Sequence, residues 1–198
     1  IFMNHETLKR IIFDQHQVIK GSVIIDRNIV LEKNVNYVLV GLRRAGKTTL
    51  LYKRALELIN EGVDWNQIIY INFDDERLLE FAANDFDDIL LVAEELSNKK
   101  HYFYFDEIQN IDGWEKFAIR IANQGYKVDI TGSNAKMLSK EVEARLGGRY
   151  ISKEIMAYSF DEFLRANKAN KEGYSVKEIG QINSLLNDKT RIRAQKSL

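Results

Sequence analysis

Short apolar runs alternate with amphipathic segments along the chain, and this alternation predicts a sheet covered by helices. The apolar runs are rich in β-branched and aromatic residues, as buried strands are. We expect strands at 36–40, 67–73, 101–105, 127–131 and 150–155. Helix-length segments separate these strands. A connection of this length can return the chain to the starting end of the sheet, so the next strand can run parallel to the previous one. The pattern therefore predicts an α/β protein, with a mostly parallel five-stranded sheet and helices on both faces.

Apolar residues recur at helical spacing between the expected strands. The helices that we expect are 7–20, 47–60, 74–96, 114–123, 135–145 and 159–169, with one more at 176–186. Ser159 and Glu162 stand three residues apart at the start of their helix, which is typical of a capping box. Segment 23–31 is apolar and β-branched, and it predicts either a short strand or an arm lying on the core.

Composition narrows the classes of protein that the chain can represent. The 198 residues carry 29 basic and 29 acidic side chains, which argues against a general polyanion-binding protein. No apolar run approaches the roughly 18 residues of a membrane span, and the charged first segment predicts no signal peptide. Cysteine is absent, which excludes disulfides and thiolate metal sites. We therefore expect a cytoplasmic protein without membrane association.

The octet from Gly41 to Thr48 matches the phosphate-binding pattern G-x-x-x-x-G-K-[ST]. It follows an apolar strand and opens a helix, which is the context that the pattern requires. Glycines allow backbone N–H groups to converge on phosphate oxygens, Lys47 adds a cation for the β- and γ-phosphates, and Thr48 offers a hydroxyl ligand for Mg²⁺. The predicted nucleotide-binding residues of this loop are Gly41, Leu42, Arg43, Arg44, Ala45, Gly46, Lys47, Thr48 and Thr49.

Two carboxylates, Asp106 and Glu107, follow the apolar strand 101–105. Ligands of parallel sheets gather at the carboxyl ends of the strands, so both should lie beside the phosphate loop. We expect Asp106 to hold the Mg²⁺ shell through water and Glu107 to polarise the water that attacks the γ-phosphate. Asp74 and Asp75 end the preceding strand, and they either reach the same edge or cap the next helix.

Small polar residues end the strand 127–131, and arginines follow the next helix. Ser133 and Asn134 can hydrogen-bond the γ-phosphate or the attacking water, and capping of the next helix is the alternative role. Arg149 follows a glycine pair and is the main candidate to neutralise negative charge in the transition state, with a structural ion pair as the alternative. Arg145 is a second candidate. The predicted catalytic residues are Glu107, Lys47, Arg149 and Ser133.

Six blocks of sequence carry a resemblance to a known family. They are GLRRAGKTTLL at 41–51, YINFDDERL at 70–78, FDEIQNIDGWE at 105–115, ITGSNAKML at 130–138, LGGRY at 146–150 and YSFDEFL at 158–164. Together they resemble the AAA-like P-loop ATPases of prokaryotes of the AAA_14/DUF4143 type. The resemblance implies that the TGSN strand lies between the P-loop strand and the acidic strand. It also implies the roles given above for Lys47, Thr48, Asp106, Glu107, Ser133 and Arg149.

The resemblance further implies an ATPase core that precedes a separate C-terminal domain. We predict an N-terminal helix and arm at 1–35, the P-loop ATPase core at 36–165, and the start of a truncated C-terminal helical region at 166–198. We expect the chain to be a piece of a longer protein. The predicted function is Mg²⁺-dependent binding and hydrolysis of ATP, as a switch or motor for a protein or nucleic-acid partner. The C-terminal domain of the same protein is another expected partner, and oligomerisation is compatible with the sequence.

Three alternatives compete with an ATPase. A GTPase needs an N-K-x-D motif, and the nearest match, NKKH at 98–101, lacks the aspartate and comes too early. A small-molecule kinase needs an Arg-rich lid, which the sequence after Arg149 does not supply. A non-catalytic nucleotide sensor or a nucleic-acid-associated scaffold stays open as the alternative function. The basic residues Arg43, Arg44, Lys53 and Arg54 could contact a polyanion or simply be solvated.

Overall fold

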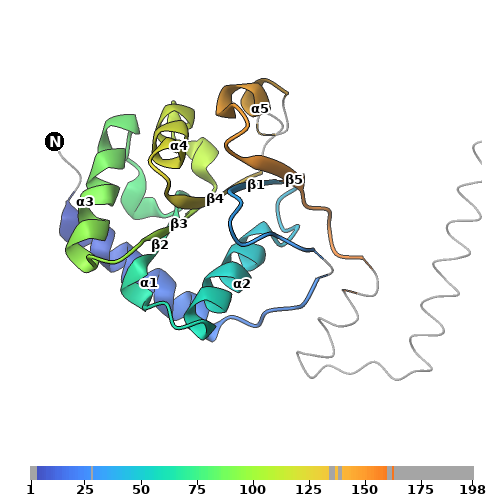
Figure 1. Cartoon of the computed structure of the whole chain (residues 1–198), viewed down its shortest axis with the longest axis horizontal. Helices are drawn as coiled ribbons and strands as arrows, with labels where there is room; N and C mark the ends of the chain where they lie inside the picture. Colours follow the sequence, from blue (N-terminus) through green and yellow to red (C-terminus); the bar gives the residue numbers. More distant parts are fainter. Residues whose placement is uncertain (1–3, 28, 134–136, 138–139, 160–161, 163–198) are drawn as a thin grey trace, which may run out of the picture. The chain divides into compact units, whose positions relative to one another are not determined.

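The computed structural model describes residues 4–27, 29–133, 137, 140–159 and 162. The chain separates into two compact units, one formed by 1–24 with 28–157 and the other by 25–27 with 158–198. The first unit contains the sheet and its helices (Figure 1). The predicted helix at 176–186 and most of that at 159–169 lie outside the described residues, and the predicted domain boundaries stay predictions.

Five parallel strands form one sheet in the order β2-β3-β4-β1-β5. They are β1 (Tyr37–Val40), β2 (Ile68–Asn72), β3 (Tyr102–Asp106), β4 (Lys127–Gly132) and β5 (Ile151–Glu154). The predicted fold class is confirmed, down to the number of strands and their direction. Strand β4 lies between β1 and β3, as the family resemblance implied.

Helices cover both faces of the sheet (Figure 1). They are α1 (His5–Gly21), α2 (Lys47–Asn60), α3 (Phe86–Leu96), α4 (Trp114–Asn123) and α5 (Lys140–Leu146). Side chains alternate along each strand, so Val38 and Val40 belong to the core that includes residues of α3 and α4, whereas Tyr37 and Leu39 belong to the core that includes residues of α2. Each face therefore has its own apolar core.

Helix α1 covers the edge of the sheet at β2. Leu8, Ile11 and Ile12 join the core under α3, and Ile19 joins the core under α2. The buried His16 ring donates from Nε2 to the backbone oxygen of Ile68 at 2.8 Å, so the helix binds the strand directly. Burial lowers the pKa of His16. The helix therefore shields an edge that would otherwise expose backbone polar groups.

Two segments differ from, or refine, the sequence-based expectations. The expected long helix at 74–96 is wrong in its first half, because α3 begins only at Phe86. Two 3₁₀ turns precede it, η2 (Glu76–Leu78) and η3 (Ala83–Asp85). The Asp75 side chain accepts from the backbone N–H of Arg77 at 3.0 Å, and such local bonds compete with a continuous helix. In segment 23–31 the described residues form no strand, which agrees with the arm alternative.

The described part of the second unit contains the predicted capping box. The backbone N–H of Ser159 donates to Glu162 Oε2 at 2.8 Å, and that of Glu162 donates to Ser159 Oγ at 3.2 Å. Arg27 Nε also donates to Glu162 Oε1 at 3.1 Å. The Glu162 carboxylate thus joins two distant segments of this unit.

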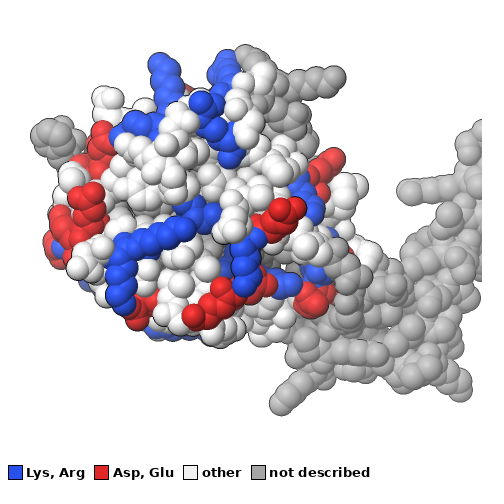
Figure 2. Space-filling model, in the orientation of Figure 1, with Lys and Arg blue, Asp and Glu red and all other residues white. Residues whose placement is uncertain are grey.

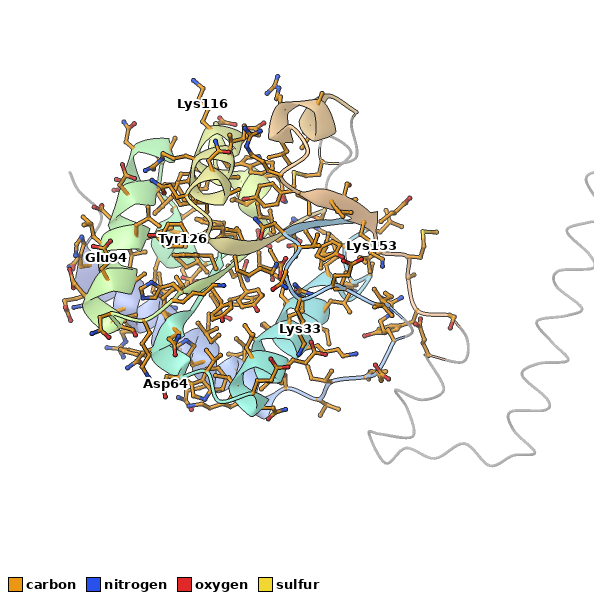
Figure 3. All side chains as sticks on the ribbon, viewed as in Figure 1. Lys33, Asp64, Glu94, Lys116, Tyr126 and Lys153 are labelled. Atoms are coloured by element: carbon orange, nitrogen blue, oxygen red, sulfur yellow. The ribbon has the colours of Figure 1, made fainter. Side chains whose placement is uncertain are left out.

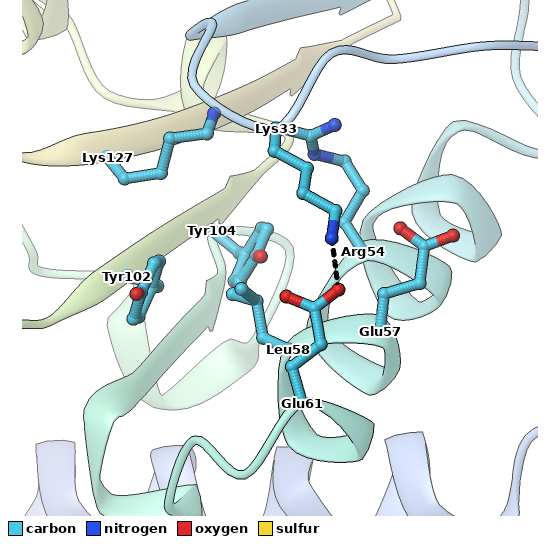
Figure 4. A pocket seen from close by; sticks show the side chains of 8 residues that line it. All are labelled: Lys33, Arg54, Glu57, Leu58, Glu61, Tyr102, Tyr104 and Lys127. Carbon is cyan, nitrogen blue, oxygen red and sulfur yellow. Dashed lines mark hydrogen bonds and ion pairs between the residues drawn. The ribbon is translucent and has the colours of Figure 1, made fainter.

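A buried group of charges fastens α2 to the sheet. Asp129 on β4 is fully buried and accepts from Arg54 Nε at 2.6 Å, Lys127 Nζ at 2.7 Å and the Tyr37 backbone N–H at 2.9 Å. Burial lowers the pKa of Lys127 to about 8 even though Asp129 favours its charged form. Figure 4 shows Arg54 and Lys127 lining a small cavity whose mouth holds an ion pair of Lys33 and Glu61.

Charges of both signs occupy the surface. Glu94 on α3 and Lys116 on α4 are exposed at the periphery (Figure 3). Basic and acidic side chains are interspersed on the face shown in Figure 2, in keeping with the balanced composition. Among the described residues, no helix has the length and apolar character needed to cross a membrane.

Candidate functional site

The loop that joins β1 to α2 turns sharply and passes close to the backbone directly after β5. Gly41 has φ 149°, and a Cβ on it would lie 2.2 Å from the backbone oxygen of Ile155. Gly46 has φ 87° immediately before α2. Between them the Ala45 N–H donates to the Leu42 carbonyl at 3.2 Å and closes a turn. Both glycines of the motif are therefore required by the backbone itself.

The amino end of α2 is open to an anion. The helix begins at Lys47, and the residue before it, Gly46, supplies no side-chain cap. The first N–H groups of a helix lack intrahelical acceptors, and the helix dipole favours negative charge there. Lys47 is buried, and its ammonium group donates to the carbonyls of Gly41 at 3.0 Å and Leu42 at 2.9 Å. The loop thus gathers positive charge at the carboxyl end of β1.

Asp106 ends β3 beneath this loop and is almost completely buried. Its carboxylate accepts from Thr48 Oγ1 at 2.7 Å, from Tyr70 OH at 2.9 Å and from Thr131 Oγ1. Burial raises the pKa of Asp106, and the three hydroxyl donors partly oppose that rise. The structure therefore brings together Thr48 and Asp106, the two residues predicted to serve the metal.

Glu107 follows Asp106 in a left-handed backbone conformation, with φ 53°, which is uncommon for a residue with a side chain. Its N–H donates to Thr131 Oγ1 at 3.0 Å. Its carboxylate Oε2 accepts from Gln109 Nε2 and from Ser133 Oγ, both at 2.6 Å, and its Oε1 lies 4.0 Å from Lys47 Nζ. Three of the predicted catalytic side chains, those of Lys47, Glu107 and Ser133, thus meet at one place.

The sequence did not single out Tyr70, Thr131 or Gln109. Tyr70 is the one hydroxyl in an apolar run, and Thr131 ends a strand beside the recognised Ser133. Both sequence signals are weak, because the residue that each hydroxyl contacts depends on which strands are neighbours in the sheet. Gln109 stands two residues after Glu107 and carried no signal of its own.

The donor set is suited to a magnesium–phosphate complex. Mg²⁺ in phosphate-binding sites takes one or two protein oxygens and completes its shell with water and phosphate oxygens. Thr48 and Asp106 offer such a hydroxyl–carboxylate pair. Within the described ranges, no group of three His, Asp or Glu side chains could hold a metal ion unaided. A metal at this site would thus depend on phosphate oxygens for much of its coordination.

Within the chain, Arg149 lies away from these residues, and its predicted role at a γ-phosphate stays a prediction. It precedes β5, so it lies at the amino ends of the parallel strands, whereas the loop lies at their carboxyl ends. Its side chain is exposed, and it donates to Asn123 Oδ1 and to the Gly147 carbonyl. Arg145, the second candidate, pairs with Glu115 at 3.3 Å.

The remaining predicted residues divide by exposure. Leu42, Arg43 and Arg44 are exposed on the outside of the loop, and Ala45 is buried within it. Thr49 is half-buried in the first turn of α2. Asn134 lies outside the described residues.

Comparisons with known proteins identify relatives of this chain. The sequence model of AAA_14, an AAA domain, matches residues 33–164. An uncharacterized protein of Methanocaldococcus jannaschii is 37% identical over 183 residues, which cover 91% of this chain and 40% of that protein. An uncharacterized protein of Haemophilus influenzae is 36% identical over 147 residues, which cover 72% of this chain and 36% of that protein. The chain thus spans less than half the length of these relatives.

A solved structure shares the fold. The closed state of Hsp104 with ATPγS and casein, determined by electron cryo-microscopy, superimposes with a TM-score of 0.50 and 18% sequence identity. The similarity covers 85% of this chain and 32% of that chain.

Proposed function

The chain belongs to the AAA_14 family of AAA domains, and from this premise we propose that it binds ATP with Mg²⁺ and hydrolyses the bond to the γ-phosphate. One observation carries the proposal. Thr48 Oγ1 lies 2.7 Å from the Asp106 carboxylate, and Lys47 Nζ lies 4.0 Å from that of Glu107. A phosphate-loop lysine and hydroxyl thus face two strand-end carboxylates, which is the set of groups that ATP hydrolysis requires.

In this proposal the phosphate loop and Asp106 bind ATP and Mg²⁺. Backbone N–H groups at the amino end of α2 and the Lys47 ammonium group would bind the phosphates. Thr48 and Asp106 would hold Mg²⁺, which when bound neutralises charge on the phosphate oxygens. The hydroxyls of Tyr70 and Thr131 keep the Asp106 carboxylate oriented toward Thr48.

In this proposal Glu107 activates the water that hydrolyses ATP. Its carboxylate would orient a water molecule, whose oxygen bonds to the γ-phosphorus while the bond to the β–γ bridging oxygen breaks. The proton of that water passes to solvent or phosphate through the carboxylate. Ser133 donates to Glu107 Oε2 and so fixes the direction of the carboxylate. We propose a positioning role for Ser133 on this basis.

We propose that the domain works as a switch or motor within a longer protein. Its partner would be the remainder of that protein, another protein or a nucleic acid. A non-catalytic nucleotide sensor is the alternative, because Glu107 Oε2 already accepts from both Gln109 and Ser133. Phosphate release during repeated turnover distinguishes an enzyme from a sensor.

The experiment that tests binding compares two lysines of the same helix. Lys47→Ala should weaken ATP binding at least about tenfold, or 1.4 kcal/mol, because it removes the cation that faces the phosphates. Lys53→Ala is the control, since Lys53 is a partly exposed residue of α2 that pairs loosely with Glu57 at 4.0 Å. Its ATP affinity should stay within about twofold. Calorimetry measures both, and equal affinities for Lys47→Ala and wild type would contradict the proposal.

Asp106→Asn tests the metal pair. The amide cannot supply the anionic oxygen that Mg²⁺ prefers, so the enhancement of ATP affinity by Mg²⁺ should be largely lost. Titrations with and without Mg²⁺ measure this enhancement for the wild type and the variant. An undiminished enhancement would remove Asp106 from the proposed metal site.

A further inference from the structure

The loop that joins β2 to α3 forms a groove that the nucleotide site does not use. The groove encloses about 380 Å³, within the range of roughly 300–1,000 Å³ typical of ligand sites. Phe73, Leu78, Phe81 and Ile111 form its apolar lining and are each at least nine-tenths buried. Leu79 also lines it but is 85% exposed, so a large apolar side chain stands at its mouth.

The walls of this groove are firm. The rings of Phe73 and Phe81 pack at 5.5 Å between centroids, and each packs in turn on Phe86 of α3. The Phe81 N–H donates to the Leu78 carbonyl at 2.9 Å. A preformed apolar surface of this kind binds a partner with little loss of its own conformational entropy.

The segment that forms one side of the groove carries negative charge. Segment 74–80 has four acidic residues and one basic residue, Arg77. The Arg77 guanidinium is already shared between Asp75 and Asp14, both at 2.7 Å. Asp74, Glu76 and Glu80 are exposed. A phosphate backbone would be repelled here, whereas Lys and Arg side chains would be attracted.

A short turn connects the groove to Glu107, the residue with the proposed catalytic carboxylate. The turn η4 (Ile108–Asn110) has Glu107 as its N-cap. Asn110 lines the groove, and its Nδ2 donates to the Phe73 carbonyl at 3.2 Å and to Asp74 Oδ1 at 2.7 Å. The Asn110 N–H donates to the Glu107 carbonyl at 3.1 Å. Movement of the groove wall would therefore reach the backbone of Glu107.

We propose that this groove binds a basic, amphipathic peptide segment of a partner protein, and that its occupancy alters the nucleotide site through η4. The apolar residues of the segment would fill the space beside Leu79, and its Lys or Arg residues would face Asp74, Glu76 and Glu80. The proposed binding of the peptide is inferred from the groove alone. The coupling to ATP rests on the proposed function.

The binding test uses a defined probe in the absence of nucleotide. The probe is a fluorescein-labelled helical peptide of about 14 residues, with Leu on one face and Lys on the other. Two further peptides replace all Leu by Ser or all Lys by Glu. Fluorescence anisotropy should detect the Lys/Leu peptide, with at least tenfold weaker binding of the other two. Equal binding of the Lys/Ser peptide would show that charge alone attracts the probe and would overturn the proposal.

Variants of exposed leucines locate the binding surface without disturbing the core. Leu79→Ser should weaken binding of the Lys/Leu peptide at least fivefold. Leu91→Ser is the matched control, because Leu91 lies on α3 and is 48% exposed. It should bind the peptide as the wild type does. Equal affinities of the two variants for the Lys/Leu peptide would overturn the proposal. Binding of a short labelled DNA by the wild type that is lost in Leu79→Ser would also overturn it.

A separate experiment measures the coupling between peptide binding and the nucleotide site. Saturating peptide should change the rate of ATP hydrolysis at least threefold in the wild type, and the effect should disappear in Asn110→Ala. If the chain binds ATP without turnover, the same coupling appears as a change in ATP affinity, because linkage between two sites is reciprocal. Peptide binding that leaves both rate and affinity unchanged would refute the coupling while retaining the docking surface.

Discussion

Replacement of Asp129 by alanine should destabilise the protein far more than loss of a surface carboxylate. Asp129 is fully buried, and it is the carboxylate between Arg54 and Lys127. The side chains of these two cations are only 7% and 10% exposed. Without Asp129 they lose their counterion, and the Tyr37 N–H loses its acceptor. The helix that carries the phosphate loop also loses its charged link to β4.

The magnitude follows from these contacts. Breaking a buried ion pair costs about 3–5 kcal/mol, and an unsatisfied buried N–H costs about 1–3 kcal/mol. Arg54 and Lys127 keep backbone carbonyl partners, Glu32 and Val35 among them, which lessens the loss. We therefore expect a loss of about 4 kcal/mol at neutral pH. That is a large share of the roughly 5–15 kcal/mol by which domains are stable.

Urea unfolding followed by circular dichroism measures this loss as a shift of the midpoint. Asp87→Ala is the control, because Asp87 forms an exposed ion pair with Arg120. Its loss should be below about 1 kcal/mol. The ATP affinity of Asp129→Ala, measured where the variant is folded, should also fall, since α2 is less firmly held. Losses of similar size in the two variants would refute the argument that buried charge fastens α2 to the sheet.

Two further predictions concern charged side chains at the amino ends of the strands. Burial lowers the pKa of Lys127 to about 8, whereas an unfolded lysine titrates near 10.4, so the unfolded chain binds more protons between these values. Stability should therefore rise by about 2 kcal/mol from about pH 8 to 9.5. Urea unfolding across this range should show the rise in the wild type and not in Lys127→Met, and a flat wild-type profile would contradict the lowered pKa. Arg149→Ala should keep ATP affinity and turnover within about twofold in dilute protein, because its side chain contacts Asn123 rather than the phosphate loop. Assays over a dilution series test this, and loss of turnover with intact binding at every concentration would place Arg149 at the γ-phosphate after all.

Local sequence patterns predicted much of the fold and the position of the phosphate loop. The phosphate loop could be recognised because glycine, lysine and threonine are each required at fixed spacing by one short turn. Strands such as β3 were predicted because buried parallel strands are apolar throughout. Asp106 and Glu107 could be placed near the loop because both end such a strand. These inferences depend on neighbours in sequence, which are known in advance.

The remaining features depend on contacts between distant segments. Tyr70 and Thr131 reach Asp106 only because β2 and β4 flank β3, an order that spacing alone does not determine. The neighbours of Arg149 also depend on such contacts, because its partner Asn123 ends α4. The late start of α3 reflects side chain–backbone bonds around Asp75 that helical periodicity does not report.

Phosphate release by Glu107→Gln under saturating Mg²⁺ and ATP tests the proposed hydrolysis at its chemical step. The amide is nearly isosteric with the carboxylate but cannot accept a proton from water. Glu94→Gln, on the exposed face of α3, is the control. We expect Glu107→Gln to bind ATP with an affinity close to that of wild type and to release phosphate at least about a hundredfold more slowly. Phosphate release by Glu107→Gln at the wild-type rate would show that the Glu107 carboxylate does not activate the attacking water.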